Sequence, residues 1–334
     1  MLKKIGLVIL LCGFYSVVKA DFDGLLKQLP FSQQDKQQIF QGELVSTQVK
    51  ESEDHELAVL LAFVVKTTPA ALKQHFIKGT WIDIPEPILM HQKLTSTSTV
   101  KDLSELKFSV NESNEIESFL SVQAGNNLNF SATEIKQFQS ITPTENQADE
   151  VQKAVEEQLH KVLLSRFQAY AAGGVKAISP YQRQQGKQFY LGEYFQTITG
   201  FSPILQQYYP IFYQTLSNYP LNKPSQLQES FFALKLKVEG RPTFSLMHRM
   251  LLEEGEAFAV SLRQFYVTQS YNGEQGLGLF IPIKEGVLVL GLFRTSSDAV
   301  AGFGSSVKHA VGRRLLAYNL TTFYEKVQQL IKTK

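Results

Sequence analysis

From Phe231 to Phe293 the chain consists of five apolar segments separated by short turns, and this feature constrains the fold more than any other. The segments are rich in Val, Leu and Phe and partly alternate with polar residues, and the turns include GRP, EEGE and KEG. A turn of a few residues joins antiparallel strands, since a parallel connection needs about a dozen residues or more. The pattern therefore predicts an antiparallel meander.

A second β-like region precedes the meander, over residues 42–66. The segments GELVSTQV and LAVLLAFVVK flank the charged turn KESEDHE and predict a hairpin. Thr68 as an N-cap, Pro69 at the first helical position and Gly79 at the end predict a short helix directly after it. Residues 80–130 alternate weakly between polar turns and predict several modest antiparallel strands with one exposed face.

The middle of the chain changes to helical patterning. Capping boxes that begin at Ser131 and Thr144 predict two helix starts, and the second opens a long amphipathic helix that ends at Gly173. Residues 175–224 place prolines between aromatic residues, which predicts short helices separated by proline stops.

The chain ends in a predicted helix from about Ser306 to Ile331. Its apolar residues recur at helical spacing, so one face is expected to be buried, and the meander offers the surface for it. The residues at this spacing are Val307, Val311, Leu315, Leu320, Phe323, Tyr324, Val327 and Leu330.

The predicted fold class is α+β, with a curved antiparallel sheet wrapped on the long C-terminal helix and a mostly helical insertion. Residues 21–130 form the first part of this α+β domain, and residues 225–334 form the second part with the C-terminal helix. Residues 131–224 form the insertion or lid between them.

The first twenty residues have the pattern of a secretory signal peptide. Lys3 and Lys4 precede an apolar run over residues 5–18, which is too short to span a bilayer and is followed by VKA. Cleavage is expected after Ala20, which gives a periplasmic or secreted product. Cys12 is the only cysteine of the chain. The bulky residue before it disfavours lipidation, and the mature chain would be held together by its core rather than by disulfides.

The charge balance gives no overall tendency to bind nucleic acid or anionic membranes. The chain has 33 basic and 31 acidic residues, and removal of Lys3, Lys4 and Lys19 leaves 33 − 3 = 30 against 31. No second apolar run approaches the length of a transmembrane helix, so a soluble mature product is expected.

The order of the elements resembles the helix-grip fold of START and Bet v 1-like (SRPBCC-type) proteins. The residues that carry the resemblance are GELVSTQV and LAVLLAFVVKTTPAALKQHF near the start, and VLVLGLFRTSSDAVAGFGSSVKHAVGRRLLAYNLTTFYEKVQQLI at the end. The stretches SLRQFYVTQSYN, LFRT and GFGSSVKHAVGRR also resemble those of exported bacterial proteins of unassigned function. The helix-grip resemblance implies a cavity between sheet and helix that binds a lipid-like or other hydrophobic molecule.

The glycine-rich stretch before the last helix lacks both nucleotide motifs. Val307 stands where a dinucleotide fingerprint needs its third glycine, and Lys308 is followed by a histidine rather than by Ser or Thr. Free N–H groups of Ser305, Ser306 and Val307, together with Lys308, are candidates to hold an anion such as a lipid head group. Alternatively, the glycines serve backbone geometry and the nearby cations pair with acidic residues.

His248, Arg249 and Arg263 are the polar candidates for orienting a ligand. Alternation places His248 and Arg249 on opposite faces of one strand, and Arg263 is expected to be a cross-strand companion of Arg249. The predicted apolar lining of the cavity consists of Leu246, Phe265, Leu279, Leu315, Leu320 and Phe323.

No motif for metal binding, nucleophilic catalysis or a cofactor is found, and none of these is predicted. The leading hypothesis is an exported binding protein for a hydrophobic or amphipathic small molecule. Two alternatives stay open. One is an enzyme that modifies such a ligand, with His248 as its base. The other is a ligand-free interaction protein of the cell envelope, with an exposed aromatic patch over residues 189–219. A transient membrane contact is a further expectation.

Overall fold

An eight-stranded sheet organises the part of the chain that the computed structural model describes, which is residues 22–78, 88–125, 127–142, 148–200 and 202–332, without the side chains of residues 22, 23, 26, 323 and 326–332. The strands are β1 (Val45–Gln48), β2 (Glu56–Val65), β3 (Ile88–Leu94), β6 (Gln228–Val238), β7 (Arg241–Glu254), β8 (Ala257–Val267), β9 (Gly273–Ile283) and β10 (Gly286–Ser296). They lie in the order β1-β2-β10-β9-β8-β7-β6-β3, and every neighbouring pair is antiparallel.

The predicted meander and the predicted hairpin are both confirmed. Strands β6 to β10 are neighbours in chain order, and β1 pairs with β2. The hairpin joins the sheet through β2, which pairs with β10 over ten residue pairs from Val287↔Val65 to Ser296↔Glu56. The last strand of the chain is therefore placed beside one of its first.

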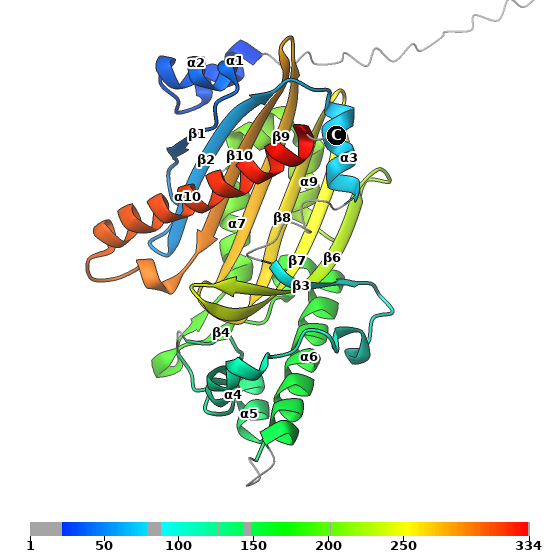
Figure 1. Ribbon diagram of the computed structural model, residues 1–334, viewed down its shortest axis with the longest axis vertical. Coiled ribbons are helices and arrows are strands. Elements are labelled where there is room, and N and C mark those ends of the chain that lie inside the picture. The colour runs from blue at the N-terminus through cyan, green and yellow to red at the C-terminus, as the bar shows by residue number, and fades with distance from the viewer. Residues whose placement is uncertain (1–21, 79–87, 126, 143–147, 201, 333–334) are drawn as a thin grey trace, which may run out of the picture.

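Helices cover both faces of the sheet (Figure 1). On the near face in this view lie α3 (Pro69–Lys78) and α10 (Ser305–Lys332), and α7 (Leu191–Gly200) and α9 (Pro210–Asn218) lie behind the strands. The other helices are α1 (Phe22–Gln28), α2 (Gln33–Gln41), α4 (Ser113–Leu120), α5 (Ala132–Gln139), α6 (Ala148–Gly173) and α8 (Pro203–Tyr208). We call the side with α10 the front face and the side with α7 the back face.

The alternation of β2 divides its apolar side chains between the two faces. Leu60, Ala62 and Val64 belong to the large back core, which also takes in residues of α5, α6, α7 and α9. Leu61 and Phe63 belong to a smaller front core with Leu72 of α3 and Tyr324 of α10. A strand buried on both faces needs an almost continuous apolar sequence, which explains LAVLLAFVV.

Local capping signals begin the helices where the sequence predicts them. Thr68 accepts a hydrogen bond from the backbone of Ala71, and Ser131 and Glu134 form the predicted capping box of α5. The second predicted box, at Thr144, and the expected helix end at Gly79 lie outside the described residues.

The prediction of several strands over residues 80–130 is wrong for the residues that are described. The described part of this region contains one strand, β3, followed by the 3-10 turns Val100–Leu103 and Val110–Glu112 and by α4. Ile116 and Phe119 of α4 are spaced by three residues and are buried on one side of a helix, where they contact the back core. The segment EIESFL therefore follows a helical period rather than a strand period.

The α+β class with a large antiparallel sheet and a long C-terminal helix is confirmed. Among the described residues, no helix is long and apolar enough to cross a membrane. The burial predicted for the last helix is wrong in its first half, because Val307, Val311 and Leu315 are 67%, 63% and 51% exposed. A different side of the helix faces the sheet. On that side His309 and Tyr324 are buried, and Gly312 allows the side chains of Leu57 and Val300 to pack close to the helix backbone.

Candidate functional site

Two of the three predicted polar residues come together on the back face, and the third lies on the front. His248 and Arg263 are directly opposite each other in the register of β7 and β8, and both are fully buried. Arg249 is paired with Leu262 and donates to the Phe76 carbonyl in α3. The expected pairing of Arg249 with Arg263 is therefore wrong, because the register places Arg263 beside His248.

His248 and Arg263 belong to a buried polar network. The Tyr170 hydroxyl of α6 lies 3.1 Å from His248 Nδ1 and 3.4 Å from Arg263 Nη1. Glu229 Oε2 lies 3.2 Å from His248 Nε2, and Arg263 Nε donates to Gln275 Oε1 over 2.7 Å. The network links Tyr170 of α6 to residues on four neighbouring strands, β6 to β9.

Burial controls the charge of this network. It lowers the pKa of His248 to about 4, although the hydrogen bond with Glu229 opposes the shift. Burial would raise the pKa of Glu229, but hydrogen bonds from His248 and Lys223 hold it at about 2. Tyr170 stacks on Phe265 with ring centroids 3.9 Å apart, so aromatic rings enclose the polar atoms. A neutral, enclosed imidazole is suited to structural hydrogen bonding.

The residues predicted to line one cavity lie on both faces of the sheet. Leu246, Phe265 and Leu279 are buried in the back core, away from α10. Leu320 packs against the front core and Leu315 is half exposed, whereas the Phe323 side chain lies outside the description.

Three of the four predicted anion donors form hydrogen bonds within the turn before α10. The N–H groups of Ser305 and Val307 donate to the carbonyls of Gly302 and Gly304, and Lys308 Nζ donates to the Ala301 carbonyl. Both glycines have positive φ, at 78° and 74°, which favours glycine at these positions. The geometric role predicted for them as an alternative is confirmed. Ser306 is exposed.

The acidic turn between β1 and β2 fixes which side of α10 faces the sheet. Glu51 lies 2.7 Å from His309 Nδ1 and 2.9 Å from Arg313 Nη1, both on the sheet side of the helix. Close by, the buried Glu56 pairs with Arg294 of β10 at 2.7 Å. Because these carboxylates bind the polar side of α10 and the strand beneath it, the opposite side of the helix faces solvent.

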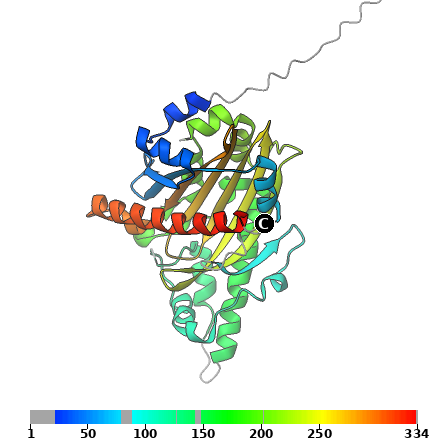
Figure 2. The ribbon, with the colours of Figure 1, turned by 45° about the horizontal axis from the view of Figure 1, so that its top comes forward.

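An apolar row follows that solvent-facing side of α10. It consists of Val307, Val311, Leu315 and Tyr318, continued at the preceding turn by Phe303, and their exposed fractions are 67%, 63%, 51%, 68% and 101%. The spacing of four, four and three residues keeps the four helical members on one face. Lys308 and Arg314 are also exposed and lie on the two flanks of this row. We call these seven residues the α10 outer face, and Figure 2 shows the helix crossing the front of the sheet.

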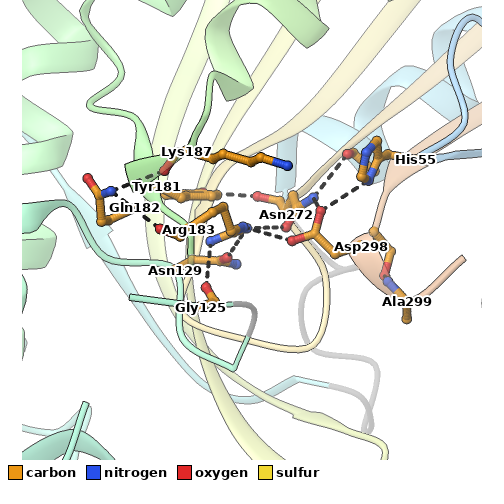
Figure 3. Close-up of polar contacts among 12 residues, drawn as sticks. His55, Gly125, Asn129, Tyr181, Gln182, Arg183, Lys187, Asn272, Asp298 and Ala299 are labelled. Carbon is orange, nitrogen blue, oxygen red and sulfur yellow. Dashed lines mark hydrogen bonds and ion pairs between the residues drawn. The ribbon is translucent and has the colours of Figure 1, made fainter. Parts of the chain in front are cut away.

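A separate polar cluster surrounds Arg183 at one end of the sheet (Figure 3). Its guanidinium donates to Asn129 Oδ1 over 2.8 Å, to Asn272 Oδ1 over 2.9 Å and to the Gly125 carbonyl over 3.1 Å. Nε lies 2.8 Å from Asp298 Oδ2 in an ion pair. Three separate segments, around residues 125–129, at Asn272 and at Asp298, thus converge on one buried cation.

Asp298 joins this cluster to His55. Asp298 Oδ1 lies 3.1 Å from His55 Nδ1, and this hydrogen bond raises the pKa of the imidazole. Burial would raise the pKa of Asp298, but His55, Arg183 and Asn272 hold it below its ordinary value. His55 is partly exposed and resembles a carboxylate-supported acid or base in its hydrogen bonding.

A small pocket of about 150 Å³ opens beside Asp298. The residues that line it are Asn129, Ser270, Tyr271, Asn272, Asp298 and Ala299. The amide side chains of Asn129 and Asn272 are already bound to Arg183, and His55 is not part of the lining. A second pocket, of about 310 Å³, lies between the start of α3 and the β7–β8 turn. Neither of these two pockets lies between the sheet and α10.

Comparison of the chain with protein-family models, with curated proteins and with solved structures finds no match. The helix-grip resemblance accordingly stays a prediction.

Sequence reasoning did not single out Arg183, Asp298, His55 or Glu51. Arg183 and Asp298 are 115 residues apart and lie in short irregular segments, so no local pattern connects them. Glu51 carried a usable signal, because the acidic turn KESEDHE complements the basic segment from Lys308 to Arg314.

Proposed function

We propose that the protein is an exported interaction protein of the cell envelope that acts through the α10 outer face. The observation that carries the proposal is the continuous apolar row along a helix whose opposite side is fixed to the sheet. Isolated exposed apolar residues are common on soluble proteins, whereas an ordered row of them is typical of an interaction surface.

The orientation of α10 supports this function because specific polar contacts between the helix and the β1–β2 turn maintain it. Glu51 binds His309 and Arg313 on one side, and Gly312 allows close approach to Leu57, so that a Cβ there would lie 2.8 Å from Leu57 Cδ1. Rotation of the helix to bury Val311 would break both contacts with Glu51. The apolar side is therefore held toward solvent.

The other two predicted functions have less support. The cavity ligand stays a prediction, and the network around His248 is enclosed by aromatic rings. The aromatic patch expected over residues 189–219 instead contributes Tyr194, Phe195, Tyr209, Phe212 and Tyr219 to the back core. Export rests on the pattern of the first twenty residues, which lie outside the described part.

Site-specific photocrosslinking in cells tests the proposal. A benzophenone amino acid in place of Val311 is expected to form adducts on irradiation. The matched control is the same amino acid in place of Val110, which is 99% exposed but lies outside α10. Adducts of equal yield at both positions, or none at residue 311, would contradict the proposal.

A further inference from the structure

We infer that the α10 outer face docks on the surface of a bilayer rich in anionic phospholipid, an inference that rests on the proposed function and names its partner. The charge of the helix, the shape of its apolar row and the poor fit of a second copy favour a lipid surface.

The charge of the α10 outer face is locally one-sided although the whole chain is nearly neutral. From Ala299 to Tyr324 the sequence contains no Asp or Glu, and it contains Lys308, Arg313 and Arg314. Arg313 is matched by Glu51 beneath the helix. Among the described residues, neither Lys308 nor Arg314 forms an ion pair. Lys308 Nζ donates to the Ala301 carbonyl, a neutral acceptor, so both charges on the solvent side lack a carboxylate partner and can interact with phosphate groups.

The apolar row has the shape expected for insertion at a membrane interface. It is a single convex line about 17 Å long from Val307 to Tyr318, at about 1.5 Å per residue. A convex row offers no walls to enclose a small molecule, but it can sink between lipid head groups with its axis in the membrane plane. Lys308 and Arg314 can extend their charged ends to the head groups from either flank of the row.

A second copy of this chain fits the surface less well. Packing two α10 helices through the same row would bring Lys308 and Arg314 of each copy to one interface that contains no carboxylate from residues 299–324. Like charges at such a contact are destabilising, whereas an anionic bilayer supplies the missing negative charge.

Vesicle sedimentation and a fluorescent reporter test the inference on the chain from Asp21 onward, the expected product of cleavage after Ala20. The probes are vesicles of phosphatidylcholine alone and of an equimolar mixture with phosphatidylglycerol. This mature chain contains no cysteine, so its Val311→Cys variant carries a polarity-sensitive label at residue 311 alone. We expect sedimentation only with the mixed vesicles, a blue shift of the label, and weaker binding as salt is raised.

Three double variants assign the contact. Val311→Gln with Leu315→Gln removes apolar contact, and Lys308→Gln with Arg314→Gln removes charge. Each is expected to weaken binding by about tenfold or more, since binding of such helices depends on both contributions. Val110→Gln with Leu221→Gln changes apolar residues elsewhere that are more exposed than Val311 and Leu315, and this variant is expected to bind like the unmodified protein. Because all these side chains are exposed, the urea midpoint should stay unchanged and report intact folding.

Failure of this inference is distinguishable from failure of the proposed function. Absent binding to the mixed vesicles, or binding that the Val311 and Leu315 changes leave intact, would overturn the lipid partner. If protein adducts then still formed at residue 311, the proposed interaction surface would stand with another occupant. A concentration-dependent dimer that the same changes dissociate would identify a second copy and overturn the inference.

Discussion

His248 and Arg263 face each other across β7 and β8 and share one neighbour, the hydroxyl of Tyr170, at 3.1 and 3.4 Å. Both side chains are fully buried. A cationic guanidinium and a second basic group can lie this close because burial keeps the imidazole neutral. The stability of the back core therefore depends on a protonation state.

Acidification should destabilise the fold through His248. Its pKa is lowered from 6.5 to about 4, so between these values the unfolded chain binds a proton that the folded chain does not. The stability that the folded state gains from a neutral His248 is fully present above pH 6.5 and is lost as the pH falls toward 4. Urea unfolding at about pH 7.5 and about pH 5 should show roughly 2 kcal/mol of this loss.

The variant His248→Gln separates the pH dependence caused by His248 from that caused by the carboxyl groups. Glu229, whose pKa is lowered from 4.5 to about 2, loses its contribution only as the pH falls below 4.5. The variant should be less stable at neutral pH but should depend less on pH over the same interval. A pH dependence equal to that of the unmodified protein would show that His248 is not the source.

Removal of Arg183 should cost far more than removal of an exposed arginine. Arg183→Met leaves Asp298 and the oxygens of Asn129 and Asn272 without their donor, which is expected to cost about 3 kcal/mol. Arg241→Met is the matched control, since Arg241 also pairs with a carboxylate but is 43% exposed, and it should cost about 1 kcal/mol or less. Equal urea midpoints for the two variants would disprove the structural importance of the Arg183 cluster.

The strands of the meander were predictable because their signals are local. A period of two residues, interrupted by short turns, determines an antiparallel order without knowledge of any distant residue. The same holds for Thr68 and Ser131, whose capping bonds span three residues. The strand prediction over residues 80–130 was wrong because weak alternation does not distinguish a strand from a short helix such as α4.

The side of α10 that faces the sheet could not be predicted from its own sequence. Apolar periodicity indicated Val307, Val311 and Leu315 as the buried side. Contacts of His309 and Arg313 with Glu51, more than 250 residues away, set the opposite orientation. The Arg183 cluster has the same origin, because its contacts come from segments joined only by the fold. In both cases the deciding contacts lie between polar groups that are distant in sequence.

Loss of Glu51 should loosen α10 locally. Glu51→Gln removes the carboxylate shared by His309 and Arg313, so the first half of the helix should open more often. Hydrogen exchange followed by mass spectrometry should show about tenfold faster exchange there, with little change in the sheet. Glu157→Gln, which removes an exposed pair with Lys161, serves as the control and should leave α10 unchanged. Protection of α10 equal to that of the unmodified protein would show that Glu51 does not stabilise the helix.

Two glycines of α7 should respond in opposite ways to alanine. A Cβ on Gly192 would lie 2.1 Å from the Val175 carbonyl oxygen, where the helix meets the turn after α6. Neither the backbone of α7 nor the segment at Val175 can move without disturbing the back core, so Gly192→Ala should cost about 2 kcal/mol or more of folding stability. Gly200, in the last turn of the same helix, has no such neighbour within 4 Å. Gly200→Ala should therefore be neutral or stabilising by up to about 1 kcal/mol, since alanine favours the helix and restricts the unfolded chain. Thermal unfolding of the two variants separates these effects, and a similar midpoint for both would show that α7 does not approach Val175 this closely.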